Sequence, residues 1–331
     1  MSIQQPLPQT VMTRPGDPRI YLRARDGEWF YYDPNHECLG SGAMGTVYLG
    51  FGTQSGRRIA IKRVKDQFAN QYLIRERAKL EASLVFNHPN VIQMLGYCEC
   101  HPTQGPIFIL SEYVSGITLE EHAKTHMAGL DVREKSKRIA SEMCNVLDGL
   151  ERIHSFGIVH RDIKPSNIML EGGKNVKLMD LGIARINGGN KFSTVGFIGT
   201  PQYASPEQIE CGSDDAIDRR SDIYALGITL YELVAGYNPY DSNIQMEVLE
   251  SQLKKRLPYN ESIDRPLFYI ISKATEKNPD RRYQSALEFK DALTAYINSE
   301  DPKPFPTGTV VAIVIAVVIV AAILCALLMF M

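Results

Sequence analysis

The stretch His160-Arg161-Asp162-Ile163-Lys164-Pro165-Ser166-Asn167 decides the fold of this chain. Short apolar runs lie on both sides of it, which is typical of a polar loop held between two strands. The loop presents a carboxylate at Asp162, an ammonium group at Lys164 and a carboxamide at Asn167. A general base, a phosphate-neutralising cation and a metal-binding oxygen are the groups needed to move a phosphoryl group onto a hydroxyl. The stretch therefore suggests phosphoryl transfer, if the other parts of such a site occur elsewhere.

Toward the N-terminus, a glycine-rich segment follows the pattern G-x-G-x-x-G-x-V. Its members are Gly40, Gly42, Gly45 and Val47. Glycines let a backbone lie close over phosphates, because no Cβ atom intervenes. A dinucleotide-binding fold also shows three such glycines, but it requires a helix directly after them. Here residues 46–49 are typical of a strand, and a second strand over 59–62 ends in Lys62. The segment therefore predicts a lid over nucleotide phosphates.

Toward the C-terminus, the strand-like residues 176–179 deliver Asp180 to a turn, eighteen residues after Asp162. A carboxylate there can bind a Mg²⁺ ion that bridges two phosphates, with Asn167 as a second ligand. Three further segments follow in order at 199–207, 222–227 and 279–282. Cys98-Glu99-Cys100-His101 has no second pair at ligand spacing, so we do not expect a zinc site there.

The composition is that of an ordinary globular protein. The chain has 331 residues, of which 44% are apolar and 22% charged, and its formal net charge is −2. Since no global basic field exists, nucleic acid is not an expected partner. The first part is rich in predicted strands and has one predicted helix at 72–86. The second part is helical, with helices predicted at 132–154, 223–235, 246–255, 267–274 and 286–297.

The two ends of the chain differ from the middle. Residues 1–28 contain four prolines, all within the first eighteen positions, and show little apolar periodicity. We therefore predict a flexible segment before a domain over 29–297. A proline-punctuated linker over 298–308 leads to residues 309–331, in which no charged residue occurs. A helix of that length would span about 30 Å of hydrocarbon, so we predict a single-pass C-terminal membrane anchor in a lipid bilayer. Small residues four apart, as at Ala312 and Ala316, make a homodimer through the span an open alternative.

Taken together, the motifs resemble those of the eukaryotic-type protein kinase superfamily, and most of all its bacterial serine/threonine kinases. They run in the family's order and cover roughly residues 30–297. The resemblance implies an α+β, two-lobed protein kinase fold, with an antiparallel sheet and one helix in the first lobe and a mainly helical second lobe. It also implies ATP as co-substrate, Mg²⁺ (with Mn²⁺ as a substitute) as cofactor and proteins with Ser or Thr acceptors as partners.

The resemblance also assigns roles to individual residues. Asp162 would be the catalytic base, Lys164 would steady the γ-phosphate, Asn167 and Asp180 would bind the metal, and Lys62 would hold the α- and β-phosphates. A buried pair between Glu207 and Arg282 would brace the second lobe, and Asp222 would hold the catalytic loop from below. The residues implied to contact the nucleotide are Leu39, Gly40, Gly42, Gly45, Val47, Ala60, Lys62, Glu76, Glu112, Val114 and Met169.

Lys62 needs a carboxylate partner on the helix that follows it. The helix offers Glu76 and Glu81. Compared with related sequences, the interval from the glutamate to His88 is too long for Glu76 and too short for Glu81. Because Arg75 precedes Glu76 and Leu80 follows one turn later, we expect Glu76 to be the partner and leave Glu81 open.

Two features of the resemblance concern substrate and regulation. Lys164 and Thr200 are typical of serine/threonine kinases, and Arg161 marks the members whose activation loop is ordered by phosphorylation. Thr194 is the expected site, with Ser193 as the alternative. We predict a cytoplasmic kinase domain that autophosphorylates this loop. A membrane-tethered pseudokinase that binds ATP as a scaffold is the alternative, although such proteins usually lack a reacting residue.

Overall fold

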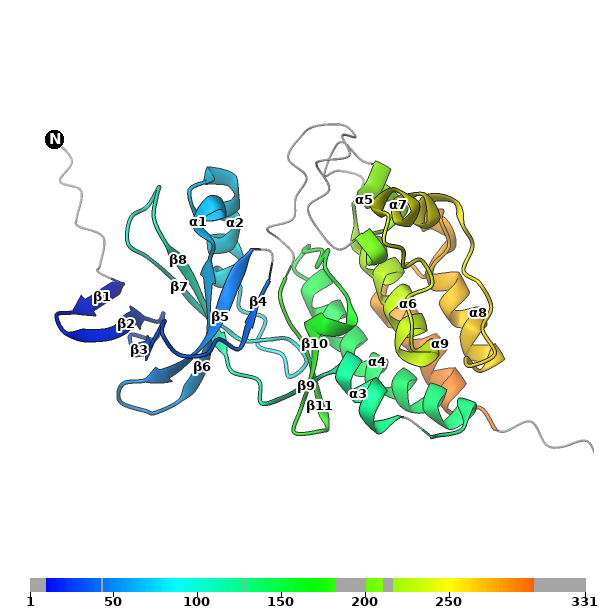
Figure 1. The fold of residues 1–331 in the computed structure, drawn as a ribbon. Coiled ribbons are helices and arrows are strands. Elements are labelled where there is room, and N and C mark those ends of the chain that lie inside the picture. Colours follow the sequence, from blue (N-terminus) through cyan, green and yellow to red (C-terminus); the bar gives the residue numbers. More distant parts are fainter. Residues whose placement is uncertain (1–9, 43, 128, 182–200, 211–216, 301–331) are drawn as a thin grey trace, which may run out of the picture. The chain divides into compact units, whose positions relative to one another are not determined.

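An eight-stranded antiparallel sheet carries the glycine-rich segment and Lys62 (Figure 1). The computed structural model describes residues 10–42, 44–127, 129–181, 201–210 and 217–300, and its main compact unit ends at Ile297. Along the sheet the strands follow the order β1-β2-β3-β5-β6-β8-β7, and β4 pairs with β5. The strands are β1 (Val11–Arg14), β2 (Asp17–Arg23), β3 (Trp29–Tyr32), β4 (Gly40–Ser41), β5 (Gly45–Gly52), β6 (Arg58–Val64), β7 (Met94–Glu99) and β8 (Ile107–Glu112).

The prediction of a flexible segment over residues 1–28 is wrong for the residues from Thr10 onward. Val11–Arg14 and Asp17–Arg23 form an antiparallel hairpin, and β2 continues the sheet by pairing with β3. Leu22 is fully buried in the same core as Phe30. The prediction rested on the four prolines and the weak apolar periodicity of this segment. However, Pro15-Gly16 is a turn signal between two strands, and Gly16 has the positive φ of 77° that such a turn demands.

Two helices accompany the large sheet. A short α1 (Asp66–Ala69) precedes α2 (Tyr72–Ser83), which packs on β7 and β8. Ala78 and Ala82 of α2 are buried against the apolar side chains of these strands. Their small side chains allow the helix axis to approach the sheet closely. The helix ends three residues earlier than the predicted 72–86.

The second lobe is built around α4 (Val132–His154), which has the bounds that the apolar spacing predicts. It packs against α6, α9 and β11, and its buried face includes Ile139, Met143 and Leu150. The Asp131 carboxylate caps its N-terminus by accepting hydrogen bonds from two backbone amides. The other helices are α3 (Leu119–His126), α5 (Pro206–Glu210), α6 (Arg219–Ala235), α7 (Gln245–Lys254), α8 (Arg265–Ala274) and α9 (Ala286–Ile297).

Four of the predicted helices are confirmed as α4, α7, α8 and α9 within two residues, and α6 begins four residues earlier than predicted. Helix α3 is not among the predicted helices. Its signal was present, because Thr118 and Glu121 form a capping box at its N-terminus. A three-stranded sheet of β9 (Gly116–Thr118), β10 (Ile168–Glu171) and β11 (Asn175–Leu178) frames the catalytic loop, with β10 in the middle.

The predicted membrane anchor at 309–331 lies outside the described residues. Within the part of the chain that the structure describes, no helix combines the length and the apolar character needed to cross a bilayer.

Candidate active site

The loop before β10 brings the predicted base and the predicted metal ligand together. The side chain of Asn167 donates from Nδ2 to the Asp162 carboxylate at 2.7 Å and to the Asp162 carbonyl at 2.9 Å. Lys164 Nζ lies 3.5 Å from the same Asp162 carboxylate. Asp162 and Asn167 are buried, so their orientations are set by these contacts. Because the amide protons of Asn167 face Asp162, its carboxamide oxygen remains as the atom for a cation.

Two buried side chains, one on α6 and one in the loop itself, fix the backbone of this loop by hydrogen bonds. Asp222, on α6, accepts hydrogen bonds from the backbone amides of His160 and Arg161, each at 2.8 Å, and lies 2.8 Å from His154. The ring of His160 accepts from the Asp162 amide at Nδ1, at 3.3 Å, so its Nε2 is the donor to the Met179 carbonyl at 2.9 Å. Burial lowers the pKa of His160 despite the acidic groups around it, which keeps the ring neutral.

Lys62 lies opposite this loop and forms an ion pair with Asp180. The distance from Lys62 Nζ to Asp180 Oδ1 is 3.0 Å. Lys62 sits in the middle of β6, between Val47 of β5 and Ile109 of β8, so its backbone is fixed on both sides. The positive charge of Lys62 lowers the pKa of Asp180, so this carboxylate is ionised at neutral pH. The two residues lie 118 positions apart in the sequence, and the fold alone brings them together.

Two of the site's residues have unusual backbone conformations. Among the described residues other than glycine, positive φ angles occur at Asn87, Arg161 and Asp180. The last two belong to the loop over residues 160–167 and to the turn after β11, with φ of 66° and 40°. A non-glycine residue in this region costs roughly 1–3 kcal/mol, which a protein retains where a side chain must be aimed. This backbone strain points to a functional role of the two residues, and it cannot be read from the sequence.

The expectation that Glu76 pairs with Lys62 is wrong. Glu76 lies on the outer face of α2, nearly half exposed, and pairs with Lys79 one turn along the helix at 3.0 Å. Glu81 is buried in the last turn, and its negative charge is among those that raise the pKa of Lys62 against the effect of burial. The helix phase explains the outcome, because positions five residues apart on a helix face different directions. Glu81 is therefore the carboxylate of α2 that acts on Lys62.

The glycine-rich segment forms the turn between β4 and β5. Gly40 pairs with Val47, Leu39 donates its amide to the Val47 carbonyl at 2.8 Å, and Gly42 donates to Gly45 at 2.9 Å. A Cβ atom at Gly45 would lie 2.7 Å from the Arg63 carbonyl oxygen, so this position requires glycine. Gly40 and Gly42 are exposed and have nothing near them that a Cβ would meet, which leaves space above the turn for a ligand.

Of the residues implied to contact the nucleotide, Val47, Ala60, Glu112 and Met169 lie on four different strands. Ala60 on β6 pairs with Ser111 of β8, and Met169 is half-buried on β10. The Glu112 side chain is fixed by Lys177 Nζ at 2.7 Å and by the Gln93 amide at 2.9 Å. Val114 follows and is buried. Lys177 was missed because nothing in the sequence links it to a residue 65 positions away.

The residues present fit ATP and a divalent cation. The lysine and the two oxygen donors have the chemistry that phosphates and Mg²⁺ require, and the Lys62–Asp180 pair shows that cationic and anionic groups already face each other there. In the described ranges, no group of three or more His, Cys, Asp or Glu side chains could hold a metal alone. With ATP bound, phosphate oxygens would add to the ligands that Asn167 and Asp180 offer. The predicted phosphorylation sites Ser193 and Thr194, with Thr200, lie outside the described residues.

This fold and this set of residues define a protein kinase. The sequence profile described as "Protein kinase domain" matches residues 34–294, which is most of the chain, and the chain belongs to this family. The match starts after the β1–β2 hairpin. The assignment confirms the two-lobed fold expected from the motifs.

Individual relatives are bacterial serine/threonine kinases. The chain is 33% identical over 277 residues to "Serine/threonine-protein kinase PknB" of Mycobacterium tuberculosis, covering 81% of this chain and 43% of that protein. It is 34% identical over 285 residues to "Probable serine/threonine-protein kinase SCO3848" of Streptomyces coelicolor, covering 83% and 40%. The chain thus spans about two fifths of the length of these relatives. The crystal structure of a point mutant of the M. tuberculosis PknI kinase domain is similar with a TM-score of 0.57 and 26% identity, covering 78% of this chain and 93% of that one.

Proposed function

We propose that this protein is a serine/threonine protein kinase that transfers the γ-phosphoryl group of ATP to protein hydroxyls, with Mg²⁺ as cofactor and Mn²⁺ as a substitute. The observation that carries the proposal is the joint placement of Lys62, Asp162, Asn167 and Asp180, each oriented by a contact within the site. The scaffold alternative is not favoured, because no reacting residue is missing. The acceptor class rests on Lys164 and on the named relatives.

Each residue has a distinct task in this reaction. The Asp162 carboxylate accepts the proton of the serine or threonine hydroxyl while the hydroxyl oxygen bonds to the γ-phosphorus. The bond from that phosphorus to the β–γ bridging oxygen breaks, and ADP leaves. Lys164, close to Asp162, neutralises charge on the transferred group. Bound Mg²⁺ would neutralise charge on the phosphates, with Asn167 and Asp180 as its protein ligands. Lys62, which forms an ion pair with Asp180 in the structure, would contact the α- and β-phosphates of bound ATP.

The proposal is tested with the full-length chain in detergent micelles, γ-labelled ATP and casein as acceptor. The active protein should label casein and itself, and acid hydrolysis should release phosphoserine or phosphothreonine without phosphotyrosine. Asp162→Asn should abolish labelling but keep ATP binding. Asp291→Asn, an exposed carboxylate on α9, serves as the matched control and should remain active. Equal labelling by wild type and Asp162→Asn would refute the proposal, and ATP binding without any transfer would support the scaffold instead.

We also propose that residues 309–331 anchor the protein in a membrane, with the kinase domain on the cytoplasmic side. The uncharged run in the sequence supports this, as does a linker of eleven residues after the compact unit. Its small-residue spacing further suggests that two spans pair into a homodimer. After an alkaline carbonate wash, full-length protein should remain in the membrane fraction and a variant lacking 309–331 should not. Equal release of both would contradict the anchor.

A further inference from the structure

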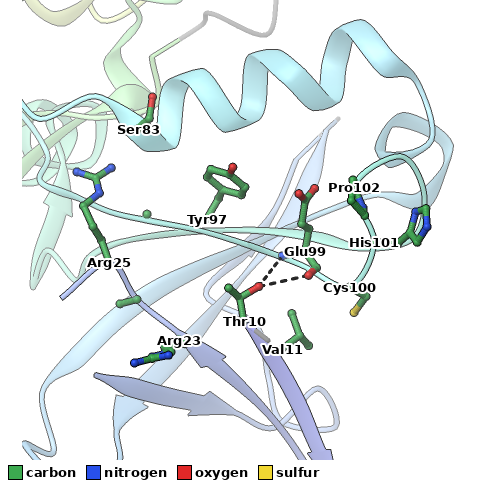
Figure 2. A pocket seen from close by; sticks show the side chains of 12 residues that line it. Thr10, Val11, Arg23, Arg25, Ser83, Tyr97, Glu99, Cys100, His101 and Pro102 are labelled. Atoms are coloured by element: carbon green, nitrogen blue, oxygen red, sulfur yellow. Dashed lines mark hydrogen bonds between the residues drawn. The ribbon is translucent and has the colours of Figure 1, made fainter. Parts of the chain in front are cut away.

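The N-terminal hairpin is fastened to β7 around a pocket that Thr10, Arg25 and Glu99 help to line (Figure 2). Thr10 Oγ1 donates to the Glu99 carbonyl and accepts from the Glu99 amide, both at 3.3 Å, as the dashed lines in Figure 2 mark. Toward the other end of β7, the Arg25 amide donates to the Leu95 carbonyl at 2.9 Å. The kinase-domain match begins at residue 34, so the hairpin is an addition that is fixed to the matched domain.

Arg25 reaches from this hairpin to the C-terminal end of α2. It lies in the turn between β2 and β3, directly after the buried Ala24. Its guanidinium donates from Nη2 to the Ala82 carbonyl at 2.8 Å. Figure 2 shows the Arg25 side chain turned toward the end of α2, where Ser83 is labelled, whereas the Arg23 side chain points to the opposite side of β7. The turn therefore places one arginine, and not its neighbour, at the end of the helix.

The end of α2 is a place where such a group stabilises a helix. The last carbonyls of a helix have no partners inside it, and their partial negative charge favours a nearby cation. The Leu80 carbonyl accepts from Ser83 Oγ at 2.7 Å, within the helix itself. The last turn of α2 reads Leu-Glu-Ala-Ser, so it contains no basic residue of its own. Arg25 supplies both a hydrogen-bond donor for the Ala82 carbonyl and a positive charge at this end.

The same last turn carries Glu81, the residue directly before Ala82. The Glu81 side chain is buried, and its negative charge acts on Lys62 of β6. The first half of α2 has a separate support, because the buried Arg75 donates to the Pro102 carbonyl at 2.9 Å. A shift of the last turn therefore moves Glu81 while Arg75 keeps its contacts.

We propose that Arg25 is a positioning residue of the kinase reaction, which holds the last turn of α2 so that the Glu81 carboxylate stays directed at Lys62. Helix ends fray before their centres do, and a frayed last turn carries Glu81 away from Lys62. Lys62 then keeps its ion pair with Asp180, whose carboxylate the metal ion needs. The effect on catalysis rests on the proposed kinase activity, whereas the hold on the helix does not.

Kinetic coupling between Arg25 and Glu81 tests the proposal, with the full-length chain in detergent micelles. Arg25→Gln should lower kcat/KM for ATP about fivefold, because a hydrogen bond and a helix-end charge are lost. Arg25→Lys keeps a donor and the charge and should stay within about twofold of wild type. In a Glu81→Gln background, Arg25→Gln should cause no further loss, because the group that Arg25 positions is already gone. In a Glu76→Gln background the whole loss should persist. Arg23→Gln, the exposed matched control, should behave like wild type.

Hydrogen exchange measures the hold on the helix without any phosphate transfer. In Arg25→Gln, the amides of residues 81–84 should exchange at least about threefold faster than in wild type, and those of α4 should be unchanged. Arg23→Gln should exchange like wild type. Unchanged exchange in Arg25→Gln would overturn the proposal, and so would an equal loss of kcat/KM in the wild-type and Glu81→Gln backgrounds, since a merely structural role predicts that result. If no variant transfers phosphate, the proposed function fails, while the exchange rates still decide whether Arg25 holds the last turn of α2.

Discussion

Arg282 donates from both terminal nitrogens to the two carboxylate oxygens of Glu207, with distances of 2.7 and 2.8 Å. Arg282 is fully buried, and its remaining protons go to the carbonyls of Arg220, Glu276 and Lys277. Burial raises the pKa of Glu207, but the hydrogen bonds and charge of Arg282 outweigh it and leave the pKa below its usual value. This pair fastens the segment around α5 to the C-terminal end of the fold.

Removal of Arg282 should be strongly destabilising. Arg282→Ala leaves the Glu207 carboxylate buried without its counter-charge, so we expect the free energy of unfolding to fall by about 3–5 kcal/mol. Arg281→Ala is the matched control, because the Arg281 side chain is exposed, and it should change stability by less than about 0.5 kcal/mol. Urea unfolding of the two variants measures the difference. Similar midpoints would show that the pair contributes little.

The roles of Glu81 and Glu76 can be separated by matched substitutions. Glu81→Gln removes the buried negative charge that acts on Lys62, so we expect kcat/KM for ATP to fall at least about tenfold. Glu76→Gln removes only a surface contact with Lys79, and kcat/KM should stay within about twofold of wild type. Steady-state kinetics with varied ATP provide the measurement. A larger effect at position 76 would restore the original expectation.

The comparison of these two glutamates shows what sequence patterns leave open. Motif order identifies Lys62, Asp162, Asn167 and Asp180, because the chemistry fixes both residue type and sequence neighbourhood. The phase of a short helix is less certain, since α2 has a charged residue on several faces and no clear apolar stripe. The burial of Glu81 depends on how α2 sits on β7, which is a property of tertiary packing. For the same reason the sequence predicts the 23 residues of α4 well, since its apolar stripe is long.

The N-terminal hairpin and its pocket could not be inferred in this way. Pro15-Gly16 marks the turn, but the pairing of β2 with β3 depends on contacts such as Leu22 opposite Phe30, across a further turn. The pocket needs Thr10 to meet Glu99, 89 positions away. Nothing local in the sequence encodes such a contact. By contrast, the Glu207–Arg282 pair was expected, because the family resemblance supplied a long-range contact that local patterns lack.

Asp222 positions the catalytic loop, and its substitution should lower the rate more than the affinity for ATP. In Asp222→Asn, an NH₂ group that cannot accept a hydrogen bond replaces one carboxylate oxygen. The backbone N–H of either His160 or Arg161 therefore loses its acceptor. We expect kcat to fall on the order of 10²-fold through misplacement of Asp162, and the free energy of unfolding by about 1–3 kcal/mol. The KM for ATP should change little. Steady-state kinetics and urea unfolding measure these changes, with Asp291→Asn as the control. An unaffected kcat in Asp222→Asn would contradict this role.

Glu142 on α4 should make stability depend on pH near neutrality. Burial raises the pKa of Glu142 from 4.5 to about 7, and its carboxyl group lies 3.0 Å from His122 on α3. Burial also lowers the pKa of His122, so at a pH between that lowered pKa and about 7 the pair is a hydrogen bond between a neutral acid and a neutral imidazole. In the unfolded chain Glu142 ionises near its ordinary pKa. The stability it contributes is therefore complete below that value and is lost as pH rises toward 7.

Glu142→Gln isolates this effect, because glutamine keeps the shape and the hydrogen bond to His122 but cannot ionise. At pH 4, below the ordinary pKa of Glu142, the two proteins should be almost equally stable. At pH 8 the variant should be more stable by about 2 kcal/mol, somewhat less than the full pKa shift implies because the side chain is partly exposed. Urea unfolding at pH 4, 5, 6, 7 and 8 gives the difference at each point. A difference that is constant across this range would mean that Glu142 ionises in the folded protein as it does in water.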